Sequence, residues 1–181
     1  ALKTGGQWEQ ASACFQEGLA RATGPEAEVA RGMLLYGLAL VESERGHLDA
    51  CEAALTEAEP LFARHRRVFY TASALILRSE VARQRGDLDA AVAHNQAALA
   101  LHEAYANPEV VVPLLNLGLL ALLRGEHAAA RELLEPTLQL CLRNRRRTYA
   151  TVAHGGLLAL CAQDLRTAPW DEHLGAISDA L

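Results

Sequence analysis

Four glycines recur along this chain at a nearly constant interval. Gly6, Gly46, Gly86 and Gly125 are separated by 40, 40 and 39 residues, and the hexapeptides around the second and third, RGHLDA and RGDLDA, are almost identical. Periodicity of this length is typical of proteins in which one helix-turn-helix unit is repeated. The spacing therefore predicts a chain of repeated helix pairs, with a glycine at the bend inside each pair.

Small residues keep the same register as the glycines. Five places after each glycine come Ala11, Cys51, Ala91 and Ala130, and twelve places after come Gly18, Ala58, Ala98 and Thr137. Seven places before the three later glycines stand Ala39, Ser79 and Gly118. Small side chains at fixed positions allow two helices to approach closely. The register thus predicts packed helix pairs as well as bends.

The composition favours helices over strands. Alanine and leucine supply most of the apolar residues, and aromatic residues make up only 5% of the chain. A glycine after an arginine suits a helix C-terminus that needs a left-handed residue, and Asp87 and Asn107 are candidate N-caps. The predicted helices are 7–22, 26–45, 48–65, 68–85, 88–105, 109–124, 127–143, 147–162 and 170–181.

This pattern resembles the tetratricopeptide repeat family. Its motif has a small residue in the first helix, a glycine turn, a bulky residue such as Leu48 or Leu88 after the turn, and small residues in the second helix. The unit here is longer than the usual one, and in this it is similar to repeat arrays of bacterial signalling ATPases and kinase-linked regulators. The resemblance implies an all-α fold: one right-handed α-α superhelix of antiparallel helix pairs over residues 1–181.

Composition and charge exclude several classes of function. The net charge of −5 gives no reason to expect nucleic acid as a partner. The longest apolar run, 110–123, is interrupted by Pro113, Asn116 and Gly118, so no membrane span is expected. Four widely spaced cysteines indicate neither a disulfide framework nor a zinc site, and we expect small core residues in a reducing, cytoplasmic compartment.

No motif for catalysis or cofactor binding is present. The seven histidines include no pair four residues apart, and no phosphate-binding loop or nucleophile elbow occurs. The carboxylates Glu42 and Glu44 are two residues apart on one helix and so should point in different directions. We therefore predict a protein that is not an enzyme and has no cofactor or metal.

The resemblance also implies where a ligand binds, because first helices of this family line the concave face. The residues predicted to face that groove are Tyr36, Leu40, Ile76, Glu80, Leu115, Asn116, Leu119 and His154. They lack the Lys and Asn with which chaperone-binding members hold a peptide carboxylate. An apolar groove instead predicts an amphipathic helix, an apolar peptide, a neighbouring domain or a second copy as occupant. The alternative is that these side chains are simply core.

Two basic clusters follow the second and fourth helix pairs. They contain Arg64, His65, Arg66 and Arg67, and Arg143, Arg145, Arg146 and Arg147. Both precede a new pair, so we expect them on one edge of the solenoid, about 20 Å apart for helices spaced by 8–10 Å. One interpretation is that these cations cap helix ends and hydrate loops. The other is an acidic partner or a phosphate group bound along this basic edge.

These features together predict a protein-interaction module that binds a protein or peptide, as the regulatory or sensor part of a larger protein. The chain starts at ALKTGG without a methionine, and we expect it to be a piece of a longer bacterial protein. The alternative is a self-association element, because Trp8, Phe15 and Leu19 should be partly uncovered. A homo-oligomer is therefore a second prediction.

Overall fold

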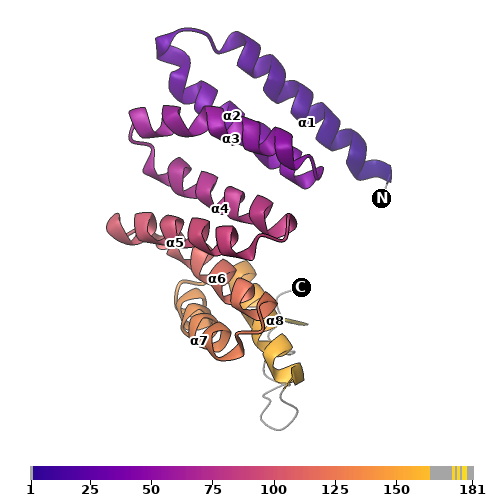
Figure 1. Cartoon of the computed structure of the whole chain (residues 1–181), viewed down its shortest axis with the longest axis vertical. Helices are drawn as coiled ribbons and strands as arrows, with labels where there is room; N and C mark the ends of the chain where they lie inside the picture. Colours follow the sequence, from indigo (N-terminus) through magenta and orange to yellow (C-terminus); the bar gives the residue numbers. More distant parts are fainter. Residues whose placement is uncertain (1, 164–172, 174, 176, 179–181) are drawn as a thin grey trace. The chain divides into compact units, whose positions relative to one another are not determined.

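A computed structural model describes residues 2–163 together with His173, Gly175, Ile177 and Ser178. These residues form helices and no strand, which confirms the all-α prediction (Figure 1). The α-helices are α1 (Leu2–Arg21), α2 (Glu28–Glu44), α3 (Leu48–Arg64), α4 (Val68–Gln84), α5 (Leu88–Ala104), α6 (Val111–Leu123), α7 (His127–Arg143) and α8 (Arg147–Gln163). Short 3-10 helices, η1 (Pro25–Ala27) and η2 (Pro108–Val110), precede α2 and α6. The predicted helix 170–181 lies outside the described residues, apart from the four positions named above.

The chain divides into two compact units whose boundary falls inside α5. Unit 1 is Ala1–His94 and unit 2 is Asn95–Leu181. Within unit 1, α2 packs against both α1 and α3, and α3 packs against α4. Within unit 2, α7 packs against both α6 and α8. Antiparallel helix pairs are therefore the building element of each unit.

One turn geometry ends six consecutive helices, α2 to α7. The left-handed residue of each turn lies about 20 places after the last, and these residues are Gly46, Arg66, Gly86, Ala106, Gly125 and Arg145. At the first of them the amide of Gly46 donates to the carbonyl of Ser43 at 3.0 Å, and the amide of His47 donates to that of Glu42 at 2.8 Å. This pair of bonds satisfies carbonyls that the helix end leaves without partners. The structural period is thus half of the glycine period.

The glycine-free turns at Arg66, Ala106 and Arg145 have φ angles of 50°, 47° and 54°. These turns could not be recognised from the residues, because only the turns inside the predicted pairs carry glycine. Two predicted caps that follow turns of this kind, one with glycine and one without, are confirmed: the side chain of Asp87 accepts a hydrogen bond from the Ala90 amide at 2.9 Å, and that of Asn107 accepts one from the Glu109 amide at 2.9 Å.

The predicted bend at Gly6 is wrong. Gly6 lies inside α1, which begins at Leu2 rather than at residue 7. The link from α1 to α2 uses a different turn, in which Gly24 has a φ of 88° and is followed by η1. Glycine within a helix costs only about 1 kcal/mol relative to alanine, so its place in a register does not by itself end a helix. The predicted helix bounds from 26 to 162 agree with the structure to within a few residues.

The core of unit 1 is built from small residues. Ala39, Cys51 and Ala58 are completely buried, as the register predicted. Larger side chains fill the remaining space, above all Leu55, Phe62 and Val81. Glycines in α2 face them closely: a Cβ on Gly32 would lie 2.9 Å from the Phe62 ring, and one on Gly37 would lie 2.4 Å from the ring of Phe15. Helix α2 is therefore in close contact with both neighbours.

The core of unit 2 is larger and richer in leucine. Its buried members include Val111, Leu115, Leu134, Leu138, Leu157 and Leu160, with Ala130 and Ala153 between them. A Cβ on Gly118 of α6 would lie 2.7 Å from the side chain of Leu134, and one on Gly156 of α8 would lie 2.8 Å from the same side chain. Leu134 of α7 thus fits between two glycines of the neighbouring helices.

The predicted role of the cysteines holds for three of the four. Cys51, Cys141 and Cys161 are buried free thiols, whereas Cys14 is exposed on α1. Burial raises the pKa of the Cys51 thiol to about 11, which keeps it protonated at neutral pH. These side chains act as small apolar residues in the helix contacts.

Candidate functional site

The predicted groove residues of unit 1 lie on α2 and α4, which contact each other directly. Leu40 is 41% exposed, and Tyr36, Ile76 and Glu80 are half-buried. A pocket of about 320 Å³ lies between the ends of the two helices. It is lined by Leu40, Ser43, Glu44, Gly46, Leu77, Glu80 and Gln84. The structure therefore brings Leu40 and Glu80 together in one open depression.

The lining of this pocket is more polar than the sequence suggested. Two leucines lie beside the carboxylates of Glu44 and Glu80, a serine and a glutamine. Glu80 accepts hydrogen bonds from Arg83 at 2.6 and 2.8 Å and from Gln84 at 2.8 Å. The bonds from Arg83 lower the pKa of Glu80 more than its partial burial raises it. The pocket thus combines two leucines with the carboxylates of Glu44 and Glu80, and Glu80 is paired with Arg83.

Tyr36, the other predicted groove residue of α2, is part of an aromatic cluster. Its ring meets that of Tyr70 edge to face at 6.0 Å between centroids, and Tyr70 stacks on the buried Phe62 at 5.0 Å. Burial raises the pKa of the Tyr36 hydroxyl, although a hydrogen bond with Ser73 opposes this. Tyr36 therefore supports the α2–α4 contact and does not line the pocket.

In unit 2 the predicted groove residues are mostly interior. Leu115 is 2% exposed and belongs to the core, and His154 is 4% exposed. The Nδ1 atom of His154 lies 2.8 Å from Nδ1 of His173. The expectation that Leu115 and His154 line an open groove is wrong, because both are buried. The predicted groove-facing positions are off by about one residue along these helices, which places the two side chains toward the interior. In this unit the alternative interpretation, that such residues are core, is the correct one.

The remaining predicted groove residues of α6 are half-buried. The side-chain amide of Asn116 donates to Oδ1 of Asn95 at 3.2 Å, and Leu119 lies beside Gly156. The large apolar side chains that α6 and α8 do expose are Leu123, 58% exposed, and Val152, 40% exposed. Sequence reasoning missed both, although each falls on the first helix of its pair.

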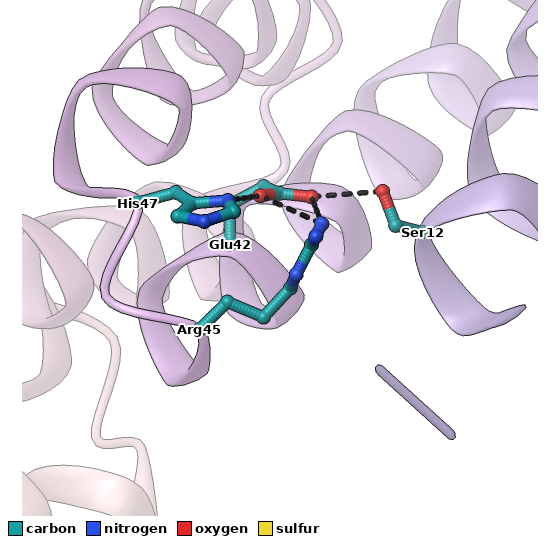
Figure 2. Close-up of polar contacts among 4 residues, drawn as sticks. All are labelled: Ser12, Glu42, Arg45 and His47. Carbon is teal, nitrogen blue, oxygen red and sulfur yellow. Dashed lines mark hydrogen bonds and ion pairs between the residues drawn. The ribbon is translucent and has the colours of Figure 1, made fainter. Parts of the chain in front are cut away.

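A buried carboxylate links α1 to α2, and no motif in the sequence indicated it (Figure 2). Glu42 is 6% exposed and accepts a hydrogen bond from Ser12 Oγ at 2.8 Å. Arg45 donates to it at 3.0 and 3.2 Å, and Nδ1 of His47 lies 2.8 Å from it. Burial alone would raise the pKa of Glu42, but the bonds from Ser12, His47 and Arg45 together lower it.

This Ser-His-Glu cluster lacks the geometry of a nucleophilic site. In such a site the serine bonds to the histidine and the histidine bonds to the carboxylate. Here Ser12 and His47 both bond to Glu42, which occupies the centre (Figure 2). The cluster therefore holds α1, α2 and the start of α3 together. Among the described residues no group of three or more His, Cys, Asp or Glu could hold a metal ion.

The two basic clusters differ in how far carboxylates neutralise them. After α3, both Arg64 and His65 bond to Glu28 of α2, and the bond with His65, followed by that with Arg64, lowers the pKa of Glu28. After α7, Arg146 donates to Glu109 at 2.9 Å, and its guanidinium lies 5.7 Å from the centroid of the Tyr149 ring. The predicted common edge joins residues of different units and stays a prediction.

The comparisons with known proteins agree with this helix arrangement. Residues 70–155 match the tetratricopeptide repeat model. The crystal structure of BtubC (BKLC) from P. vanneervenii is similar to the chain, with a TM-score of 0.78 at 16% sequence identity; the match covers 96% of this chain and 74% of that one. At this identity the likeness shows the fold alone. None of the curated proteins matches the sequence.

The apolar length of the helices and the general role of the matched repeat are two further findings. No helix in the described part of the chain is long and apolar enough to cross a membrane. Proteins with this repeat generally mediate protein–protein interactions, and their fold is typically a non-catalytic scaffold. The 40-residue register of small residues, the repeated left-handed turn and the match over residues 70–155 lead to one conclusion. Residues 70–155 carry tetratricopeptide repeats, and the chain as a whole is an all-α helical repeat protein.

Proposed function

We propose that the chain is a protein-interaction module that binds a peptide or a segment of a partner protein in the α2–α4 pocket. The observation that carries this proposal is the open depression of about 320 Å³ in which Leu40, 41% exposed, lies beside the carboxylates of Glu44 and Glu80. An exposed leucine next to negative charge fits a ligand with an apolar side chain followed by a lysine or arginine.

Both helices are held in place before a ligand arrives. The Glu42 cluster attaches α2 to α1, and Arg78 of α4 donates to Glu59 of α3 at 2.6 and 3.1 Å. A preorganised surface loses little conformational entropy on binding. We therefore expect α2 and α4 to bind the ligand without a large rearrangement. As part of this proposal the module serves a regulatory or sensor role in a larger bacterial cytoplasmic protein.

The test is selection of peptides from a random library on the purified chain, with measurement of binding to Leu40→Asp. We expect selected peptides to combine an apolar residue with a cation, and to bind the variant at least about tenfold more weakly, since a carboxylate then replaces the apolar contact. Ala53→Asp, on an exposed position of α3, is the matched control and should bind like the parent. Equal binding to Leu40→Asp and Ala53→Asp would contradict the proposal.

Self-association is the second candidate function, and exposed apolar side chains in unit 2 favour it. Tyr105 is 64% exposed, Leu123 58% and Leu142 51%. A second copy that covered these side chains would remove their apolar surface from water. Light scattering over a dilution series tests the idea: it predicts a larger mass at high concentration that Leu123→Lys abolishes. A mass that stays monomeric at every concentration excludes it.

A further inference from the structure

The turn between α7 and α8 forms a pocket of strongly positive character. Its volume is about 470 Å³, and five consecutive residues line it: Arg145, Arg146, Arg147, Thr148 and Tyr149. No carboxylate is among them. Three adjacent guanidinium groups in one depression repel each other, and an anion from outside relieves that repulsion.

The two outer arginines of this turn have no carboxylate partner among the residues that the structure describes. Arg146 is held by Glu109, whereas Arg145 and Arg147 are exposed and form no ion pair there. In the equivalent turn after α3, Glu28 pairs with Arg64 and His65, while Arg66 and Arg67 form no ion pair among the described residues. With Arg143 added to Arg145 and Arg147, the α7–α8 turn has more arginines without a carboxylate partner in the described part of the chain.

The backbone of the turn provides a way to separate binding from stability. Arg145 has a φ of 54°, a conformation that favours glycine, and glycine occupies the equivalent position of the turns at residues 46, 86 and 125. Ala106 adopts the same conformation, so the strain alone is no evidence of a site. It does mean that Arg145→Gly removes a charge and relieves strain at the same time.

We propose that the α7–α8 turn binds an acidic segment of a partner protein, rich in aspartate and glutamate. Its carboxylates pair with Arg145 and Arg147, and Arg146 is shared between the segment and Glu109. The net charge of −5 opposes the approach of a long polyanion, while a short acidic segment meets only the local positive charge. This surface does not depend on the α2–α4 pocket proposed above.

The experiment measures fluorescence anisotropy of a labelled hexaglutamate peptide titrated with the whole chain. We expect binding at low salt that weakens as salt is added, because exposed charges are screened. Arg145→Gly should weaken binding about threefold, and the double variant Arg145→Gly/Arg147→Gln about tenfold, in line with exposed ion pairs. The midpoint of thermal unfolding of Arg145→Gly should nevertheless rise.

Two controls keep the outcome free of folding effects. Arg66→Gly relieves the same strain after α3, where Glu28 neutralises the neighbouring cations, and should raise the unfolding midpoint without changing peptide binding. Glu109→Gln releases Arg146 from its carboxylate and should tighten binding about twofold.

Several results overturn the proposal. They are no binding of hexaglutamate by the parent chain, equal losses of binding for Arg66→Gly and Arg145→Gly, or no gain for Glu109→Gln. A phosphoserine peptide or a short single-stranded DNA that binds where hexaglutamate does not also overturns it, because the ligand is then of another class.

Discussion

Units 1 and 2 share helix length and turn geometry but differ in what holds their helices together. In unit 1, ion pairs join successive helices, as between Arg78 and Glu59 and between Arg85 and both Asp49 and Glu52. In the described part of unit 2, ion pairs between separate elements include Arg146 with Glu109 and Arg124 with Glu126, and a leucine-rich core provides most of the contact between helices.

This contrast indicates that the turns and the small residues define the repeat. The other contacts between neighbouring helices differ from one unit to the other. Ala39, Ser79 and Gly118 occupy equivalent buried positions in three successive pairs. Around them, one unit pairs charges at the helix surface and the other buries leucine. Exposed ion pairs contribute little to stability, whereas apolar burial contributes more. We therefore expect the two units to respond differently to packing defects, acid and salt.

The largest expected effect is overpacking in unit 2. Gly118→Val places new atoms where a Cβ already lies 2.7 Å from Leu134, and should lower the free energy of unfolding by about 3 kcal/mol. Gly155→Val is the matched control, because no atom lies within 4 Å of its Cβ position. Urea unfolding of both variants checks this. Equal destabilisation by the two variants would show that the close contact between Gly118 and Leu134 is not the cause of the loss.

The next effect concerns the buried carboxylate of unit 1. Glu42→Gln leaves Arg45 and His47 without their charged acceptor and should reduce the free energy of unfolding by about 2 kcal/mol at neutral pH. The measurement is urea unfolding at pH 7, and Glu57→Gln, at an exposed carboxylate, is the control. A loss no larger than that of the control contradicts a stabilising role for the cluster.

The pH dependence of stability, compared between the parent chain and Glu42→Gln, is a second test of the buried carboxylate. The pKa of Glu42 is lower in the folded chain than the ordinary value of 4.5. Its contribution is therefore fully present above pH 4.5 and is lost as the pH falls through the lower, folded-state pKa. Glu28 and Glu80 shift in the same direction. Hydrogen exchange between pH 5 and 3 should show α1 and α2 losing protection in the parent, and Glu42→Gln should flatten that loss.

The turn geometry is common to both units, and substitutions at two equivalent turns should change stability by smaller amounts of opposite sign. Gly86→Ala forces a side chain into a φ of 81° and should destabilise by about 1 kcal/mol, while Ala106→Gly relieves a φ of 47° and should stabilise by somewhat less. Thermal unfolding of the two variants provides the comparison. Shifts of the same sign would mean that the turns are not equivalent.

The smallest effect is expected at an exposed ion pair of unit 1. Arg31 and Glu57 are 3.4 Å apart and both well exposed. Arg31→Gln should change the free energy of unfolding by less than about 0.5 kcal/mol, and added salt should abolish the difference. Urea titrations at low and high salt measure it. A larger, salt-resistant loss would show that ion pairs carry more of the stability of unit 1 than we infer.

Much of the fold could be predicted, because the features concerned are local. Glycine at 46, 86 and 125 ends helices through its own backbone freedom, and the caps at Asp87 and Asn107 act within a few residues. The candidate sites could be predicted less well from the sequence. Leu40 and Glu80 do share a pocket, but Leu115 and His154 turn inward, since an error of one residue rotates a helical side chain by about 100°.

From the sequence alone the helices, their lengths, most of their bounds and the resemblance to tetratricopeptide repeats could be predicted, because turn chemistry and small-residue spacing are properties of neighbouring residues. Only the tertiary structure decided that Glu42 is buried among Ser12, Arg45 and His47, and that Arg66, Ala106 and Arg145 adopt a glycine-like conformation. It also decided which cations of each basic cluster pair with a carboxylate. The Ser12–Glu42 bond and the ion pairs of Glu28 and Glu109 depend on atoms brought together from different elements, and such packing leaves no periodic mark in a single chain.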